Sequence, residues 1–167
     1  MKIKKRRRGK IQGQPRKMAV AIGTGFGAGY WPWGAGTAGA LLATLIWIAL
    51  SYMFTPLCLL ILTTILVVAF TALGVWAANR LEPHWGEDPS RVVVDEMVGA
   101  WIALLVAKPF VWWHAWAAFT LFRFFDMAKP LGIRRMESIP GGWGVMMDDV
   151  LAGVYSAMVL FVIECLT

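Results

Sequence analysis

Hydrophobic residues occur in long runs that short polar loops interrupt, a pattern typical of a chain that crosses a membrane repeatedly. Two predicted spans cover residues 36–54 and 56–78, each close to the ~20 residues that a helix needs to cross the hydrocarbon core. A third apolar stretch, residues 92–107, would be only ~24 Å long at ~1.5 Å per residue. We expect this stretch to tilt or to insert only in part.

Two further hydrophobic runs complete the pattern. After Lys108 and Pro109, residues 110–125 form a fourth apolar stretch and residues 145–166 a fifth. Polar segments rich in Gly and Pro separate the runs at 79–91 and 127–144. The pattern predicts an all-α fold, a polytopic membrane helix bundle of about five apolar segments.

Composition supports a membrane protein of one domain. The chain has 167 residues, 59% of them hydrophobic, and its mean hydropathy is +0.62. A chain of this length has no room for a separate soluble catalytic domain, so any chemistry is expected in the bundle and its loops. We divide it into a basic cytoplasmic tail, residues 1–17, and a membrane-embedded domain, residues 18–167.

The distribution of basic residues predicts which side faces the cytoplasm. With the tail inside, every Lys and Arg except Lys108 lies on the inner side, as the positive-inside rule requires. The tail is expected to set this topology and to contact anionic lipid headgroups. Nothing that follows it is typical of a nucleic-acid-binding fold, so no nucleic-acid partner is expected.

The acidic residues gather on the same side. All except Glu164 fall in loops or helix ends at the predicted cytoplasmic interface. Carboxylates crowded at the mouth of a helical bundle are costly to desolvate, so they call for a cation, and a divalent metal suits oxygen ligands. These residues are Glu82, Glu87, Asp88, Asp95, Glu96, Asp126, Glu137, Asp148 and Asp149.

Two clusters favour a metal or catalytic role. Asp95 and Glu96 open the third apolar stretch, where the helix dipole would explain one acid but not two adjacent ones. Asp148 and Asp149 follow a glycine-rich turn and lie inside the last predicted helix, whereas a capping aspartate would stand at its very start. Both pairs therefore indicate contact with a metal or a substrate.

Two other clusters leave alternatives open. Arg123, Asp126 and Lys129 share one helical face, so they form an intrahelical ion pair, or the bases hold a phosphate while Asp126 faces the metal. The glycine-rich segment 23–39 includes Gly36 and Thr37 at a helix start. Its glycines either let backbone N–H groups approach a phosphate or let membrane helices pack closely.

Taken together, these segments resemble the phosphatidylglycerophosphatase A family. The matching motifs are Gly25-Phe-Gly-Ala-Gly29, Asp95-Glu96-x-x-Gly99, Arg123-x-x-Asp126-x-x-Lys129-Pro130 and Gly141-Gly142-x-Gly144-x-x-x-Asp148-Asp149. The resemblance covers residue 23 to the C-terminus. It implies a Mg²⁺-dependent phosphomonoesterase that acts on phosphatidylglycerophosphate at the inner face of the bacterial cytoplasmic membrane.

The resemblance sets the expected roles. Asp95, Asp126, Asp148 and Asp149 are predicted to be catalytic, and the same four with Glu96 form the pool of Mg²⁺ ligands; which of them act on water stays open. Arg123, Lys129, Thr37 and Gly36 are predicted to bind the phospholipid substrate. Pro140 departs from the family pattern, which leads us to expect histidine there, and the oligomeric state is not predicted.

Two other functions compete with this reading. A metal-dependent phosphotransferase that moves a phosphoalcohol between lipids would need a denser array of aspartates on one helix, and the sequence lacks it. A small carboxylate-lined cation transporter would place acids near the bilayer midplane, whereas here they stay at helix mouths. Hydrolysis of a lipid phosphate therefore stands first.

Overall fold

A computed structural model describes residues 15–86, 89–130, 132–136 and 138–166, and its regular structure in these ranges is helical. The all-α prediction is confirmed. Most of the basic tail, together with Glu87, Asp88 and Glu137, lies outside the described residues. The elements are α1 (Lys17–Gly23), the 3₁₀ helix η1 (Ala28–Tyr30), α2 (Ala35–Ser51), α3 (Pro56–Trp85), α4 (Val94–Leu104), α5 (Trp112–Ala128), α6 (Ile133–Met136) and α7 (Gly142–Leu166).

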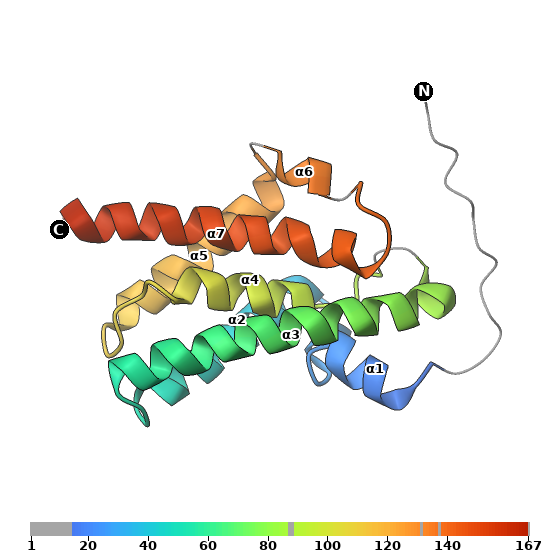
Figure 1. Cartoon of the computed structure of the whole chain (residues 1–167), viewed down its shortest axis with the longest axis horizontal. Coiled ribbons are helices and arrows are strands. Elements are labelled where there is room, and N and C mark those ends of the chain that lie inside the picture. Colours follow the sequence, from blue (N-terminus) through green and yellow to red (C-terminus); the bar gives the residue numbers. More distant parts are fainter. Residues whose placement is uncertain (1–14, 87–88, 131, 137, 167) are drawn as a thin grey trace.

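Helix α4 is the centre of the bundle (Figure 1), with α2, α3, α5 and α7 packed around it. After Asp95 and Glu96 in its first turn, its residues are apolar on every side, and all of the helix except Glu96 is buried. A helix that is apolar all round belongs in an interior. The short third stretch of the sequence is therefore a core helix, which does not need the length of a lipid-exposed span.

Glycines let α4 and α7 cross closely. A Cβ atom on Gly153 would lie 2.5 Å from the carbonyl oxygen of Gly99, and one on Gly99 would lie 2.7 Å from the carbonyl oxygen of Asp149. Only small residues permit such an approach between helices. This crossing brings the Asp149 turn of α7 against the first turns of α4.

Helix α3 is longer than the sequence predicts. The loop expected at 79–91 begins only after Trp85, and Pro83 lies inside the helix. Packing explains the extension, because Leu81 is fully buried and a Cβ atom on Gly23 of α1 would lie 2.6 Å from its Cδ1 atom. Tertiary contacts here outweigh the helix-breaking tendency of proline.

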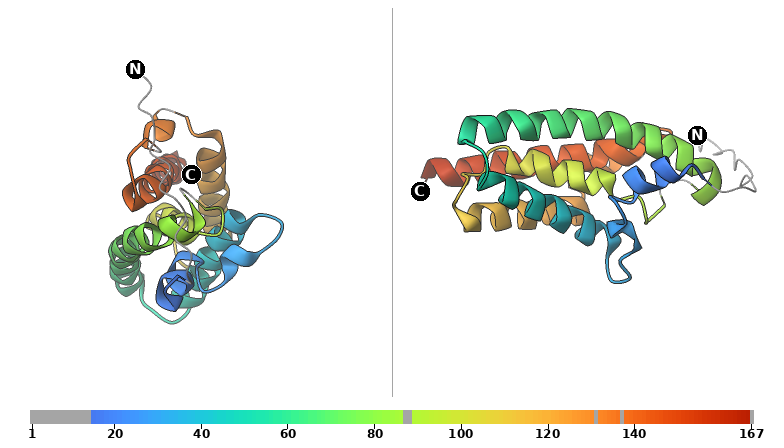
Figure 2. Two further views of the ribbon diagram at one scale, coloured as in Figure 1. Left: turned by 90° about the vertical axis from the view of Figure 1, so that its right-hand side faces the viewer. Right: turned by 90° about the horizontal axis from the view of Figure 1, so that it is seen from below.

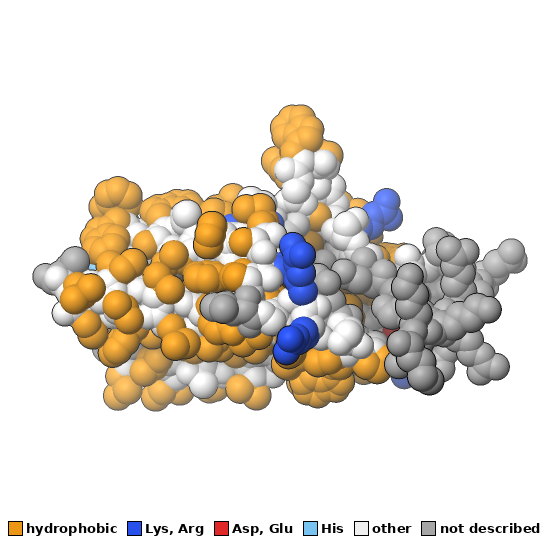
Figure 3. Space-filling model, turned by 90° about the horizontal axis from the view of Figure 1, so that it is seen from above, with side chains coloured by type: hydrophobic (Ala, Val, Ile, Leu, Met, Phe, Trp, Pro, Cys, Tyr) orange, Lys and Arg blue, Asp and Glu red, His pale blue; other side chains and the backbone are white. Residues whose placement is uncertain are grey.

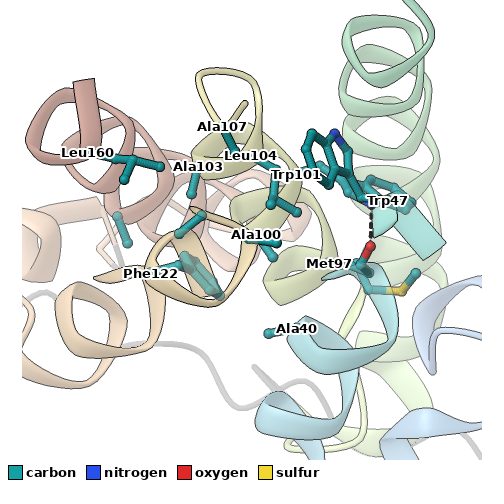
Figure 4. Close-up of a cluster of buried hydrophobic side chains, with 14 of the residues drawn as sticks. Ala40, Trp47, Met97, Ala100, Trp101, Ala103, Leu104, Ala107, Phe122 and Leu160 are labelled. Carbon is teal, nitrogen blue, oxygen red and sulfur yellow. Dashed lines mark hydrogen bonds between the residues drawn. The ribbon is translucent and has the colours of Figure 1, made fainter. Parts of the chain in front are cut away.

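The larger hydrophobic core lies where α2, α4, α5 and α7 meet. Figure 4 shows Trp101 of α4 beside Trp47, with Phe122 and Leu160 on the other side of the cluster and small Ala side chains between them. The indole Nε1–H of Trp101 donates a 3.0 Å hydrogen bond to the carbonyl oxygen of Ala43, which satisfies its one polar atom. The arrangement fixes α4 against α2 and so fixes the start of α4.

Two helices, α3 and α7, are long and apolar enough to cross a membrane. Large hydrophobic side chains on them face outward, among them Ile65, Val68 and Val162. The face in Figure 3 is mostly hydrophobic, and its Lys and Arg side chains gather toward the end where α1 and α6 lie. These features are those of a membrane protein; a multi-pass topology with about five spans stays a prediction.

Helices α2, α4 and α7 begin at the end where α1 lies, and α3 and α5 run in the opposite direction (Figure 2). The N-termini of three helices and the C-terminal parts of two others therefore meet at one end of the bundle. The predicted acidic clusters occupy these positions in the sequence, so the fold brings them together.

Candidate active site

Three carboxylates from two helices converge where α4 begins. One ligand oxygen from each of Asp95, Glu96 and Asp149 can be chosen so that all lie within 4.8 Å of one another. Asp95 and Asp149 are buried, and Glu96 is partly buried. Carboxylates this close together repel one another unless a cation lies between them.

Two polar atoms of this cluster have no hydrogen-bond partner among the described residues. They are Oε2 of Glu96 and Oδ1 of Asp149, both buried, and Asp149 is also repelled by Glu96, Asp126 and Asp148. Buried polar atoms are nearly always paired, because an unpaired one costs free energy. A hard divalent cation with oxygen ligands would satisfy both atoms, so this donor set fits Mg²⁺.

Arg123 of α5 lies next to the cluster. Its guanidinium NH1 atom donates a 2.6 Å hydrogen bond to Oδ2 of Asp126, the intrahelical pair that the spacing allows. Its Nε atom is buried and has no hydrogen-bond partner in the part of the chain that the structure describes. Asp126 therefore orients the guanidinium, which keeps a free N–H donor for an anion.

Lys129 does not pair with Asp126 along the same face. It caps α5 with a left-handed backbone (φ 44°), and its Nζ atom lies 2.8 Å from Oδ2 of Asp148 on α7. The turn at the end of α5 thus redirects the lysine to a different helix. Asp148 is engaged by a cation of the protein itself, unlike Asp149.

A cavity of about 650 Å³ opens onto the cluster, and Asp95, Glu96 and Arg123 line it. The start of α2 forms another wall, with Gly36 at the surface of the cavity. A Cβ atom at Gly36 would clash with Oε1 of Glu96 and would lie 3.3 Å from NH1 of Arg123. The missing side chain of Gly36 therefore makes room for the functional groups of both residues.

Not every predicted residue faces this cavity. Thr37 is exposed on the first turn of α2, and Pro140 is exposed in the loop before α7; neither lines the cavity. The residues that line it also do not include Asp126, Lys129, Asp148 or Asp149, although Asp149 belongs to the carboxylate cluster. The structure thus brings together Asp95, Glu96, Asp126, Asp149, Arg123 and Gly36, and the roles predicted for all these residues stay predictions.

Sequence reasoning missed two residues that also line the cavity, Tyr30 and Arg91. Arg91 counted only as one more positive charge on the inner side. Its place just before the Asp95–Glu96 helix was the available signal, since a residue there must lie near the first turn of α4.

Comparisons with known proteins place this geometry in context. Residues 21–164 match the sequence model of a family described as Phosphatidylglycerophosphatase A. A Haemophilus influenzae protein named Phosphatidylglycerophosphatase A is 36% identical over 153 residues, which cover 88% of this chain and 86% of that protein. An Escherichia coli protein with the same name is 35% identical over 144 residues, 85% of this chain and 81% of that protein.

Another relative carries a different name. A Bacteroides thetaiotaomicron protein, provisionally named a phosphatidylinositol-3-phosphatase, is 59% identical over 151 residues, 89% of this chain and 95% of that protein. No solved structure matches the chain.

Proposed function

The chain belongs to the phosphatidylglycerophosphatase A family, and from this membership we propose that it is a Mg²⁺-dependent enzyme that hydrolyses the terminal phosphate of phosphatidylglycerophosphate at the cytoplasmic surface of the membrane. One observation carries the proposal. Among the described residues, buried carboxylate oxygens of Glu96 and Asp149 have no hydrogen-bond partner, and neither does Nε of Arg123. Glu96 and Arg123 line one cavity, and Asp149 lies in the carboxylate cluster beside it.

Asp95, Glu96 and Asp149 would hold the metal, because their oxygens are the ones that lie close together. When bound, Mg²⁺ would neutralise charge on the phosphate and help to position the attacking water. Asp126 also lies against Asp149, so it is the next carboxylate in reach of the same ion.

The protein's cations would bind the phosphoryl group. Arg123 would donate to its oxygens, since Asp126 fixes the guanidinium and the Nε–H is free. Lys129, which pairs with Asp148, would add positive charge nearby. Water adds to phosphorus, the bond from phosphorus to the head-group oxygen breaks, and the two protons of that water end on the alcohol and on the phosphate.

A phosphorylated inositol lipid is a second candidate substrate. The observation that favours it is the 59% identity to the Bacteroides thetaiotaomicron protein, well above the identity to the two named phosphatidylglycerophosphatases. Both substrates are phosphomonoesters on the head group of an anionic phospholipid, so the same metal and arginine would serve either. They differ in the size of the group between the two phosphates.

The test is phosphate release by the purified full-length protein in detergent micelles. Phosphatidylglycerophosphate and phosphatidylinositol 3-phosphate are each supplied at equal surface concentration, with Mg²⁺ or with EDTA. We expect Mg²⁺-dependent release, with the higher kcat/KM identifying the substrate. Release from neither lipid would overturn the proposal and leave the cation-transport alternative in front.

Sidedness has a separate test. With the polar end inside, cysteines introduced at the exposed positions Ser90 and Ser138 should resist a membrane-impermeant thiol reagent in intact cells and react after lysis. The native Cys58 and Cys165 are replaced by alanine to remove background. Labelling of intact cells would contradict a cytoplasmic active site.

A further inference from the structure

A second cavity lies beside the first and is also about 650 Å³ in volume. The first turns of α1, the glycine-rich loop after it and the end of α3 form its walls, which are mainly apolar. Val20, Phe26 and Trp85 line it together with the basic residue Lys17. Tyr30 and Arg91 line both cavities, so the two spaces adjoin at these residues.

Arg91 is positioned at this junction by its surroundings. Its guanidinium carbon lies 5.6 Å from the centroid of the Tyr30 ring, a cation–π contact that orients both side chains. A Cβ atom on Gly29 would clash with the backbone carbonyl of Arg91. The neighbouring backbone is fixed as well, because the Val93 N–H donates a 2.8 Å hydrogen bond to the carbonyl oxygen of Gly23.

The two cavities differ in charge. The first has the carboxylates of Asp95 and Glu96 in its wall beside Arg91 and Arg123, whereas the described residues that line the second include Lys17 and Arg91 and no acid. An apolar space with basic residues at its rim suits a molecule with an anionic group and a hydrocarbon end. It does not suit a metal ion.

We infer that the second cavity binds the part of the phospholipid that is not hydrolysed, with Arg91 on the phosphodiester and the apolar walls against the diacylglycerol end. This inference rests on the proposed function, because it is that function which gives the substrate two phosphates. The terminal phosphomonoester lies at the carboxylate cluster and Arg123. The phosphodiester lies one short head group away, where the two cavities meet. Arg91 is thus a specificity-determining residue for phosphomonoesters that carry a second, diester-linked phosphate.

Product inhibition separates the two phosphate sites. Dihexanoyl phosphatidylglycerol carries the phosphodiester and no phosphomonoester, whereas inorganic phosphate resembles only the released group. The inhibition constants of both are measured against phosphatidylglycerophosphate hydrolysis for wild type, Arg91→Gln, Arg91→Lys and Arg80→Gln. Arg80 is exposed on α3 and lines neither cavity, so it controls for the loss of one positive charge at this end. Thermal unfolding in detergent and binding to anionic vesicles are recorded for each.

For Arg91→Gln we expect the inhibition constant of dihexanoyl phosphatidylglycerol to rise at least about tenfold, the loss of one charge-assisted hydrogen bond, while that of inorganic phosphate changes by less than about twofold. Arg91→Lys should recover part of the affinity, because it keeps the charge without the planar fork. Arg80→Gln should match wild type.

Three results would overturn the inference while leaving the proposed function intact. In Arg91→Gln, the inhibition constants of both inhibitors could rise equally, or neither could rise. The third result is a loss of vesicle binding alone, which would assign Arg91 to bulk anionic lipid. If Arg91→Gln does not fold, a wild-type affinity in Arg91→Lys combined with no effect of Lys17→Gln would also overturn it. A wild-type protein that releases no phosphate from the lipid would instead refute the proposed function itself.

Discussion

The two ends of the bundle each hold a carboxylate of α7, and the charges around the two carboxylates differ. At the end away from α1, Oε1 of Glu164 lies 2.6 Å from Nδ1 of His114, and Oε2 lies 3.9 Å from Nζ of Lys108. At the other end, the charged neighbours of Asp149 include the carboxylates of Glu96, Asp126 and Asp148.

This contrast separates a structural acid from a functional one on the same helix. Glu164 is paired with groups of the protein itself, so it ties α7 to α5 and to the turn between α4 and α5. Asp149 is surrounded by the carboxylates of Glu96, Asp126 and Asp148, which repel its charge. Such a residue is costly to keep and is expected where a ligand supplies the missing charge.

The largest effect is expected for Asp149→Asn. Removing a proposed metal ligand should lower kcat by more than the roughly 100-fold that loss of an outer partner of a metal ligand costs. The same change should leave the melting temperature equal to or above that of wild type without Mg²⁺, because it removes one repelling charge. Phosphate release and thermal unfolding in detergent check both parts. Full activity would exclude Asp149 from the site.

Two glycine substitutions distinguish the site from the scaffold. In Gly36→Ala the new methyl group meets the carboxylate end of Glu96, a side chain that can move. We expect activity to fall about tenfold or more, with little change in melting temperature, since a small displacement of a reacting group is enough to slow chemistry.

In Gly153→Ala the methyl group meets the backbone of α4 at Gly99, which cannot move aside. We expect a loss of about 1–3 kcal/mol in stability from overpacking. The measurements are thermal unfolding and phosphate release for both variants side by side. The same stability loss in both would show that Gly36 only packs helices.

A smaller effect on function is expected at the opposite end. Glu164→Gln removes the charged partner of the buried His114 and should cost about 1–3 kcal/mol of unfolding free energy. Phosphate release at a temperature where the variant stays folded should remain close to wild type. The chemical denaturation midpoint and the kcat of the folded fraction are measured together. A large loss of kcat in a stable variant would show that the two ends are coupled.

The smallest effect on turnover is expected from deleting residues 2–10, which lie outside the described residues. Each basic residue near an anionic surface contributes ~1 kcal/mol of attraction, so membrane binding or insertion should weaken. Turnover of the correctly inserted enzyme should stay nearly intact. Vesicle co-sedimentation and phosphate release by the membrane fraction measure the two properties. A loss of turnover by orders of magnitude would place the tail in the active site.

The sequence predicted the all-helical fold and the gathering of acidic residues at one end of the bundle, because long hydrophobic runs and charge asymmetry are local signals. Asp95, Glu96 and Asp149 were predicted to share one interface, and the structure gathers them. The burial of α4 was not predicted, since an apolar run of that length suits either a short span or a core helix.

Contacts between distant residues were beyond local signals. The Lys129–Asp148 pair depends on a left-handed turn after α5, and the His114–Glu164 pair depends on how α5 and α7 lie together. For Gly36 the sequence left phosphate approach and close packing as alternatives, and the structure shows that the missing side chain makes room for Glu96 and Arg123.

The central claim is that the unpaired carboxylates around Asp149 bind a divalent cation. The most direct measurement is thermal unfolding of the purified protein during a titration with Mg²⁺, for wild type, Asp149→Asn and Glu164→Gln. Binding to the native state alone raises its stability with the free cation concentration. We predict that the melting temperatures of wild type and Glu164→Gln rise with Mg²⁺ while that of Asp149→Asn does not. An equal rise in all three proteins, or no rise in any, would contradict the claim.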